Sequence, residues 1–173
     1  RACAYCAVKH GKPATLDLHE PVRVGEAVKA MALKYAVITS VDRDDLADGG
    51  ASIFAGTIRE IKARVPDCRV EVLIPDFKGE DSSLRTVLDA RPDILNHNIE
   101  TVPRLYRRIR PGADYQRSLD LLKAFADRGL VTKSGMFVGI GEEWDEVKQV
   151  LRDLRAHGVR SLTVGQYLRP TAE

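Results

Sequence analysis

The chain has 173 residues, of which 44% are hydrophobic and 30% charged. This length suits one compact domain, and the composition is too apolar for a disordered protein. Its 27 basic and 25 acidic residues leave a formal net charge of +2, so no overall charge points to nucleic acid or an anionic membrane. The apolar runs are strand-sized, far below the roughly 20 residues that span a bilayer. We therefore expect a soluble protein with neither a nucleic-acid nor a membrane partner.

Regular elements are predicted from short β-branched runs that alternate with stretches of helical apolar spacing. In chain order these are a helix over 20–33, a strand over 35–41, a helix over 50–65, a strand over 69–74, a helix over 82–90 and a strand over 94–99. There follow a helix over 115–128, a strand over 132–140, a helix over 142–157 and a strand over 161–168. Asp114 is expected to cap the helix after it, and Gly129 and Gly158 stand at expected helix ends.

This alternation predicts an α/β fold with parallel strands. Periodicity alone leaves two architectures open, an open doubly wound sheet and part of a (β/α) barrel. In both, ligands collect at the carboxyl ends of the strands. Residues just after each strand are therefore the first candidates for chemistry.

The three cysteines are an odd and sparse set: Cys3, Cys6 and Cys68. They favour a reducing compartment over a secreted disulfide scaffold, which predicts a cytoplasmic location, or the mitochondrial matrix in a eukaryote. The chain starts at Arg1 without a signal-peptide pattern, and we expect it to begin inside a longer sequence.

Cys3-Ala4-Tyr5-Cys6 places two thiols at a spacing with several chemical uses. Such a pair can share a zinc ion, form a redox dithiol or hold an iron–sulfur cluster. A structural zinc site needs two further ligands at matching spacing. The remaining candidates are scattered along the chain: Cys68, His10, His19, His97 and His157. The pair by itself leaves the alternatives open.

The cysteine motif, followed by residues 9–13, resembles the second half of the radical S-adenosylmethionine signature in the form that lipoyl synthases carry. Further matches cover essentially the whole chain, over residues 38–46, 48–50, 71–77, 96–103, 107–115, 132–135 and 165–168. The segment from Gly135 to Glu142 resembles the adenine-side motif of the superfamily, with Phe137 in place of an aliphatic residue. Trp144 departs from the small or acidic residue expected there.

The resemblance implies a partial (β/α)6-type TIM barrel whose first strand is missing, and one core domain over residues 1–173. An amino-terminal auxiliary-cluster segment and a carboxyl-terminal tail would lie outside it. It also implies a 4Fe-4S cluster with Cys3 and Cys6 as two of three ligands, the third standing two positions before Arg1. S-adenosylmethionine would bind the open iron, and a second, auxiliary 4Fe-4S cluster would supply sulfur.

The implied reaction is the radical-mediated insertion of two sulfur atoms at carbons six and eight of a protein-bound octanoyl group. A 5'-deoxyadenosyl radical would abstract the two hydrogens. The implied partners are an octanoylated lipoyl-carrier domain or H protein and a reducing electron donor. We expect this chain alone to be an inactive part of a sulfurtransferase.

Candidate cofactor-binding residues follow from the matching positions at strand ends, and no catalytic residue is assigned. Thr39, Ser40 and Asp42 are assigned to the methionine end of the cofactor, Asn98 and Glu100 to the ribose hydroxyls. Lys133 and Ser134 are assigned to a carboxylate. Tyr5 is the aromatic residue of the signature. Gln166 and Leu168 are assigned to the last wall of the cofactor site.

Plainer interpretations stand beside these assignments. Cys68 is interpreted as a packed cysteine and His97 as a polar group with its hydrogen bonds satisfied. Asp44 and Asp45 are interpreted as loop caps and ion-pair partners. A basic stretch, Arg104, Arg107, Arg108 and Arg110, occupies a short helical turn before Pro111. It is either a solvated face or a surface that steers an acidic carrier. Two rival functions are a biotin-synthase-like sulfur inserter and a non-catalytic zinc or dithiol module.

Overall fold

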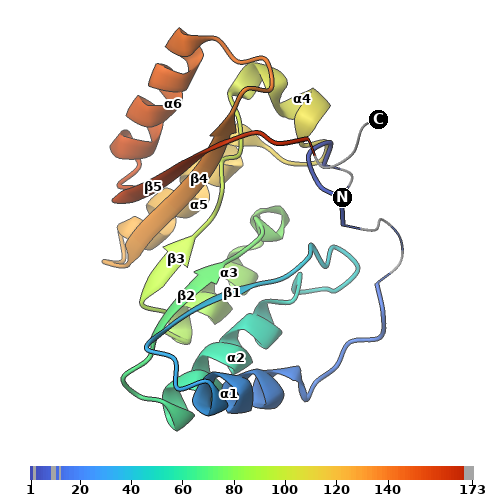
Figure 1. Cartoon of the computed structure of the whole chain (residues 1–173), viewed down its shortest axis with the longest axis vertical. Helices are drawn as coiled ribbons and strands as arrows, with labels where there is room; N and C mark the ends of the chain where they lie inside the picture. Colours follow the sequence, from blue (N-terminus) through green and yellow to red (C-terminus); the bar gives the residue numbers. More distant parts are fainter. Residues whose placement is uncertain (2, 9–10, 12, 170–173) are drawn as a thin grey trace. The chain divides into compact units, whose positions relative to one another are not determined.

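The computed structural model describes residues 1, 3–8, 11 and 13–169. The chain divides into two compact units, one formed by Pro13–Asn96 and the other by Arg1–Lys12 with His97–Glu173 (Figure 1). Each unit contains parallel strands that alternate with helices. The predicted α/β class with parallel strands is confirmed. The prediction of one domain over the whole chain stays a prediction.

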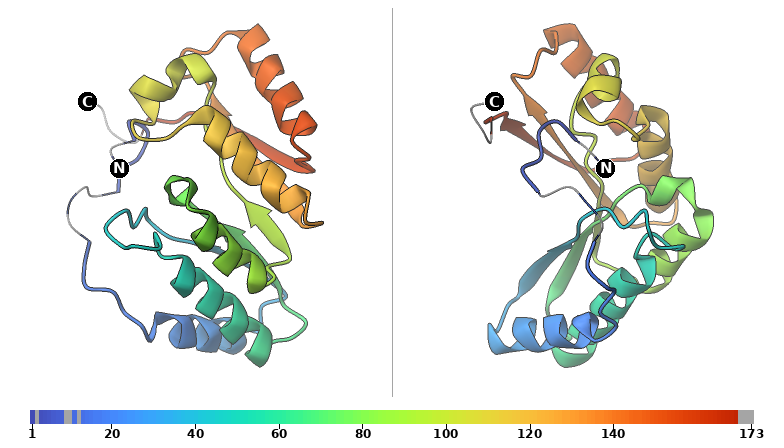
Figure 2. Two further views of the ribbon diagram at one scale, coloured as in Figure 1. Left: turned by 180° about the vertical axis from the view of Figure 1, so that it is seen from behind. Right: turned by 90° about the vertical axis from the view of Figure 1, so that its right-hand side faces the viewer.

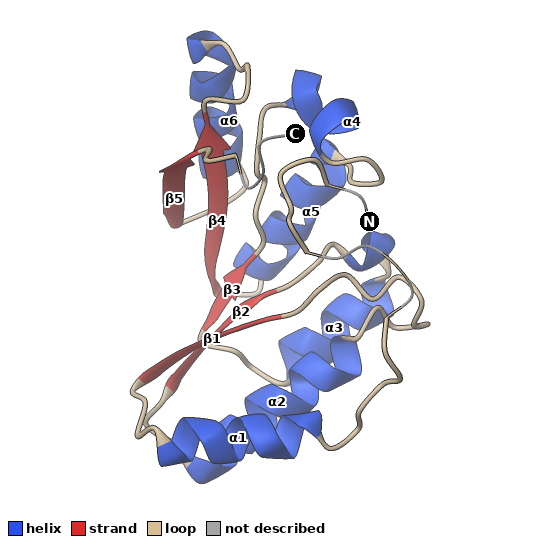
Figure 3. Cartoon of the chain, turned by 45° about the vertical axis from the view of Figure 1, so that its right-hand side comes forward, coloured by secondary structure: helices blue, strands red, loops and turns tan. Residues whose placement is uncertain are grey.

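The Pro13–Asn96 unit carries three strands and three longer helices. Their order is α1 (Glu20–Ala30), β1 (Tyr35–Thr39), α2 (Ala51–Arg64), β2 (Arg69–Leu73), η1 (Phe77–Gly79), α3 (Asp81–Asp89) and β3 (Ile94–Asn96). Parallel pairing joins β1 to β2 and β2 to β3. The three helices cover one face of these strands (Figure 3), and Ile58, Val70 and Leu95 are fully buried.

The close crossing of α1 and α2 depends on two glycines. A Cβ on Gly25 would lie 3.1 Å from Glu60 Cβ, and a Cβ on Gly56 would lie 3.2 Å from Pro21 Cγ. Each glycine thus lets the facing helix approach. Burial of apolar side chains along this crossing contributes to the stability of the unit.

The other unit carries β4 and β5 with helices on one face of them (Figure 2). Its elements are η2 (Pro103–Leu105), α4 (Tyr106–Ile109), α5 (Tyr115–Ala126), β4 (Val131–Val138), α6 (Trp144–Ala156) and β5 (Ser161–Gln166). The strands are parallel, with Lys133 opposite Ser161 and Val138 opposite Gln166. Leu122 of α5 and Val150 of α6 are fully buried.

Residues 97–100, which follow β3 in the chain, run alongside β4. His97 N donates to Lys133 O at 3.1 Å, and Glu100 N donates to Gly135 O at 2.9 Å. Glu100 also forms an isolated parallel bridge with Met136. The predicted strand over 94–99 is therefore regular only to Asn96, but its hydrogen bonding reaches Glu100.

Helix ends agree with several capping predictions. Asp114 Oδ1 accepts from Arg117 N at 2.7 Å and caps α5, as expected. Gly129 and Gly158 adopt left-handed φ values of +82° and +79° just past α5 and α6. The helix predicted from 142 begins at Trp144 instead, because Glu143 is its N-cap and forms a capping box with Glu146.

Strand ends were predicted too far along the chain. The strand predicted over 35–41 ends at Thr39, and that predicted over 132–140 ends at Val138. Gly139 follows with a φ of +101°, which takes the backbone out of the strand. Among the described residues, no helix is long and apolar enough to cross a membrane.

Candidate active site

The two cysteines of the signature lie in a tight turn that is fastened to α4. Cys6 N donates to Cys3 O at 3.1 Å, and Ala4 N donates to Ile109 O at 2.9 Å. Both thiols are free and half-buried. The turn therefore brings two cysteines close together in the chain, and its position is fixed by the end of a helix.

Tyr5, between the two cysteines, anchors this turn to the strands. Its ring centroid lies 4.9 Å from that of Phe137 on β4, which in turn lies 5.6 Å from that of Tyr167. The Tyr5 hydroxyl is hydrogen-bonded to the Glu100 carboxylate and to the Cys3 side chain. Burial, together with the negative charge of Glu100, raises the pKa of Tyr5, so the hydroxyl stays protonated as a donor.

Glu100 occupies a backbone conformation that a residue with a side chain rarely adopts. Its φ is +64°, in the left-handed region, which costs about 1–3 kcal/mol for a residue other than glycine. Burial raises the pKa of Glu100, while the Arg110 charge and hydrogen bonds from Asn98 and Tyr5 oppose that rise. Strain of this kind persists where the surroundings hold a side chain in one orientation.

Gly135 on β4 makes room for the Asn98 side chain. A Cβ at position 135 would lie 2.6 Å from Asn98 Oδ1 and 3.0 Å from Asn98 Cγ. Only glycine therefore allows Asn98 to lie where it meets the Glu100 carboxylate. Asn98, Glu100, Tyr5 and Cys3 are thus brought into one contiguous polar cluster.

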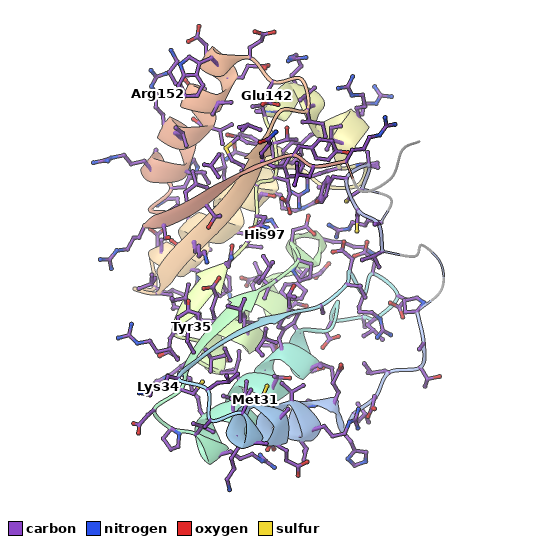
Figure 4. All side chains as sticks on the ribbon, in the orientation of Figure 1. Met31, Lys34, Tyr35, His97, Glu142 and Arg152 are labelled. Carbon is purple, nitrogen blue, oxygen red and sulfur yellow. The ribbon has the colours of Figure 1, made fainter. Side chains whose placement is uncertain are left out.

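The loop after β4 is held by a second set of polar contacts. Glu142 accepts hydrogen bonds from Gly139 N and from Ile140 N (Figure 4). Burial disfavours the charged carboxylate, but bonds from these and neighbouring backbone amides dominate and lower the pKa of Glu142. Trp144, the residue that departs from the family pattern, is 69% exposed beside this loop.

Arg104 fastens the same loop to α6. Its Nε and Nη2 donate to the two Glu146 carboxylate oxygens at 2.7 and 2.8 Å, and Nη2 donates to Gly141 O at 2.8 Å. Arg104 is thereby committed to an internal ion pair. Arg110 is only 8% exposed, so the interpretation of the basic stretch as a solvated face is wrong for this residue. Arg107 and Arg108 are exposed.

The Arg104–Glu146 pair predicts a pH-dependent contribution to stability. The Arg104 hydrogen bonds, and then the bond from Glu143 N, lower the pKa of Glu146 from 4.5 to about 2. A depressed carboxylate pKa means that the contribution is complete above pH 4.5 and is lost as pH falls toward about 2. Glu146→Gln should lower the melting temperature at pH 7 by roughly 2–4 °C, an exposed pair being worth little.

Thermal unfolding from pH 7 to pH 2 measures this contribution. The difference between the wild type and Glu146→Gln should shrink below pH 4.5, the ordinary pKa of the carboxyl. Asp145→Asn, in the same helical turn, is the matched control and should show a smaller difference. A gap between wild type and Glu146→Gln that stays constant down to pH 2 would contradict the assignment.

The structure also places the other predicted residues of the cysteine-bearing unit. Ser134 is fully buried, where its hydroxyl donates to His97 O at 2.9 Å and accepts from Ile99 N at 3.2 Å. These bonds hold the backbone of residues 97–99, and the cofactor role of Ser134 stays a prediction. Lys133 is half-buried in the first half of β4, and Gln166 and Leu168 are exposed at and after the end of β5.

Thr39, Ser40 and Asp42 belong to the Pro13–Asn96 unit and not to the unit that holds the cysteines. Thr39 is the last residue of β1, and Ser40 Oγ donates to Val41 O at 2.9 Å. Nearby, Arg43 pairs with Asp45 at 2.9 Å, which confirms the ion-pair interpretation of that carboxylate. Lys78 Nζ donates to the backbone carbonyl oxygen of Asp44 at 3.1 Å. The cofactor roles of Thr39, Ser40 and Asp42 stay predictions.

The structure also shows the surroundings of His97 and Cys68 and bears on metal binding. His97 is buried with Nε2 3.0 Å from Ser118 Oγ, a satisfied polar group as interpreted. Cys68 is buried, also as expected. Across residues 1, 3–8, 11 and 13–169 there is no group of three or more His, Cys, Asp or Glu side chains that could hold a metal ion.

Sequence reasoning missed two features of the cluster. One is the burial of Arg110, because in the sequence this residue belongs to a basic stretch. The available signal is its spacing of four from Tyr106, which places both residues on one face of a helix. The other is the row of aromatic rings from Tyr5 through Phe137 to Tyr167. In the sequence, Phe137 stands out only as a departure from an aliphatic pattern.

Comparison with known proteins decides the family. The sequence profile of the radical SAM superfamily matches residues 1–154 of the chain. The chain belongs to this superfamily. The match spans the cysteine turn, the Glu100 cluster and most of α6. The resemblance drawn from the cysteine motif is thereby confirmed.

Curated relatives of this radical SAM chain include lipoyl synthases. The lipoyl synthase of Rubrobacter xylanophilus is 60% identical over 173 residues, which is 99% of the chain and 54% of that protein. The lipoyl synthase of Haemophilus ducreyi is 58% identical over 174 aligned residues, 99% of the chain and 53% of the relative. The chain thus spans about half the length of these relatives.

Solved structures resemble the radical SAM chain in fold. Methylornithine synthase matches with a TM-score of 0.71 at 14% identity, over 96% of the chain and 49% of that protein. Streptococcus suis SuiB bound to S-adenosylmethionine matches with a TM-score of 0.77 at 11% identity, over 98% of the chain and 38% of that protein. These similarities confirm the predicted partial-barrel class of α/β fold.

Proposed function

We propose that this chain is the radical core of a lipoyl synthase, the sulfurtransferase that inserts two sulfur atoms into a protein-bound octanoyl group. The observation that carries the proposal is 60% identity over 173 residues to a curated lipoyl synthase. The site agrees with it, since the cysteine turn is fixed beside the half-buried carboxylate of Glu100. Carbons six and eight are the proposed positions of insertion.

The residues of the cysteine turn fit part of an iron–sulfur site. Cys3 and Cys6 are free, half-buried and joined by a backbone hydrogen bond of 3.1 Å. A cluster held by three cysteines needs one ligand more than this pair supplies, and Cys68 belongs to the other unit. A 4Fe-4S cluster with bound S-adenosylmethionine would supply the radical chemistry, and an auxiliary 4Fe-4S cluster the sulfur.

The chain's own residues would bind and orient the nucleotide. Glu100, with Asn98 donating to it, offers carboxylate oxygens to paired hydroxyl groups. Phe137 and Tyr167, in the same unit, provide aromatic rings against which the face of an adenine would pack. Tyr5 keeps the cysteine turn at a fixed distance from Glu100, which gives the geometric precision that radical chemistry requires.

The proposed protein partners are an octanoylated lipoyl-carrier domain or H protein and a reducing electron donor. Arg104 is engaged in its ion pair with Glu146, and Arg110 is buried and bonded to internal carbonyls. Arg107 and Arg108 are exposed, Arg108 with one bond from Nη2 to Ile140 O at 3.3 Å, and their charges support an acidic carrier surface as the docking partner.

An assay of sulfur insertion tests the proposed function and its rivals together. The complete protein, reconstituted without oxygen with iron and sulfide, receives S-adenosylmethionine, a reductant and either octanoylated carrier protein or dethiobiotin. Mass spectrometry of the carrier should show the lipoyl product, and dethiobiotin should stay unchanged. Sulfur insertion into dethiobiotin would favour a biotin-synthase-like enzyme. One bound zinc without iron would favour the metal-binding module.

A further inference from the structure

Arg110, at the carboxyl end of α4, is a buried cation with an unusual set of partners. Its Nη1 donates to Asn98 O at 3.0 Å, to Ile99 O at 3.2 Å and to Tyr106 Oη at 3.1 Å. The guanidinium carbon also lies 5.3 Å from the centroid of the Tyr106 ring. Burying a charge is costly unless it is well bonded, so this guanidinium is held where its bonds are needed.

The acceptors of these bonds lie immediately before Glu100. Tyr106 donates its hydroxyl to Ile99 O at 2.7 Å, so this carbonyl accepts from both Tyr106 and Arg110. On the other side, Phe137 N donates to Glu100 O at 3.0 Å. The left-handed backbone of Glu100 is therefore held by β4 on one side and by the Arg110–Tyr106 pair on the other.

The same end of α4 also holds the cysteine turn. Ile109, the residue before Arg110, accepts the hydrogen bond from Ala4 N at 2.9 Å. Tyr5 then completes the connection, because its hydroxyl is bonded to the Glu100 carboxylate. One short segment thus holds both the backbone of the cysteine turn and the backbone that leads to the Glu100 carboxylate.

We propose that Arg110 is a positioning residue: with Tyr106 it holds the Asn98–Glu100 backbone at a fixed distance from the Cys3–Cys6 turn and thereby sets the affinity for S-adenosylmethionine. The inference rests on the proposed function. It differs from a steering role for the basic stretch, because Arg110 is 8% exposed and donates to internal carbonyls. Its Nε has no hydrogen-bond partner among the described residues, so the role depends on Nη1 and on the planar charge.

The test compares the affinity of variants of the complete, iron-reconstituted protein for S-adenosylmethionine. Equilibrium dialysis and the change in the cluster's electron paramagnetic resonance spectrum measure this affinity. Arg110→Gln should weaken binding at least tenfold, since a charge-assisted set of hydrogen bonds is lost. Arg110→Lys keeps the charge but lacks the guanidinium geometry, and should recover part of the affinity. Tyr106→Phe, which removes one hydroxyl, should weaken binding about threefold to fivefold.

Iron content and melting temperature separate positioning from simple folding. Arg152→Gln removes the same charge from an exposed site on α6 and is the control, with unchanged affinity (Figure 4). The inference is overturned if the folded, iron-loaded Arg110→Gln and Tyr106→Phe proteins bind S-adenosylmethionine as tightly as the wild type. A wild-type protein that holds iron but binds no S-adenosylmethionine would instead overturn the proposed function.

Discussion

Replacing Cys3 or Cys6 with alanine will remove one of the two proposed iron–sulfur clusters, and about half of the visible chromophore, from the reconstituted complete protein. The two thiols share one turn, held by the bonds from Cys6 N to Cys3 O and from Ala4 N to Ile109 O. Neither thiol can be replaced by a neighbour, because among the described residues no third metal-binding side chain joins them. Bound iron should fall by roughly half, since the cluster of this turn depends on each thiolate ligand while the proposed auxiliary cluster keeps its own iron.

Iron and sulfide analysis, with the visible absorption of the protein, measures this loss. Cys68→Ala is the matched control, because Cys68 is 2% exposed in the other unit and bonds only weakly, with Sγ 3.6 Å from Arg69 O. It should keep its iron and lose about 1–2 kcal/mol of unfolding free energy to the small cavity. Full iron content in the Cys3→Ala and Cys6→Ala proteins would refute the assignment of this turn as the cluster site.

Substituting alanine for Gly135 will weaken S-adenosylmethionine binding in the complete protein without preventing folding. The new Cβ would lie 2.6 Å from Asn98 Oδ1, so the Asn98 side chain must turn away and release Glu100. A hydrogen bond to a charged group contributes about 1.5–3 kcal/mol, which corresponds to roughly tenfold or more in affinity. Calorimetric titration with S-adenosylmethionine measures the change.

A double-mutant cycle makes the cause of this loss specific. Asn98→Ala alone should weaken binding by a similar factor, because it removes the same bond to Glu100. Adding Gly135→Ala to Asn98→Ala should then cost no further affinity, since no side-chain amide remains to be displaced. Losses that simply add would show that Gly135 acts through some other contact.

Local patterns predicted the elements well because each depends on near neighbours. The spacing of apolar residues located the longer helices and the strands, and the Asp114 cap was recognised from one residue type at one position. Element ends were less accurate. The chain leaves β4 at Gly139 and enters α6 through the Glu143 cap, and these choices depend on hydrogen bonds that no apolar pattern records.

Burial of polar residues was harder to predict, because it depends on contacts between distant parts of the chain. Ser134 and Arg110 both look like surface or ligand residues in the sequence. In the fold, Ser134 holds residues 97–99 from within the unit, and Arg110 donates to carbonyls more than ten residues away. Neither role can be read from residue type or spacing.

The sequence by itself determined the superfamily, the α/β class and the pair of thiols, because motif residues and strand periodicity are properties of the chain in order. The tertiary structure alone decided how Glu100 is held. Its left-handed backbone, the space left by Gly135 and the bonds from Arg110 exist only when residues 3–6, 98–110 and 135–137 meet. The physical reason is that an unfavourable backbone conformation and a buried charge persist only where several distant partners hold them together.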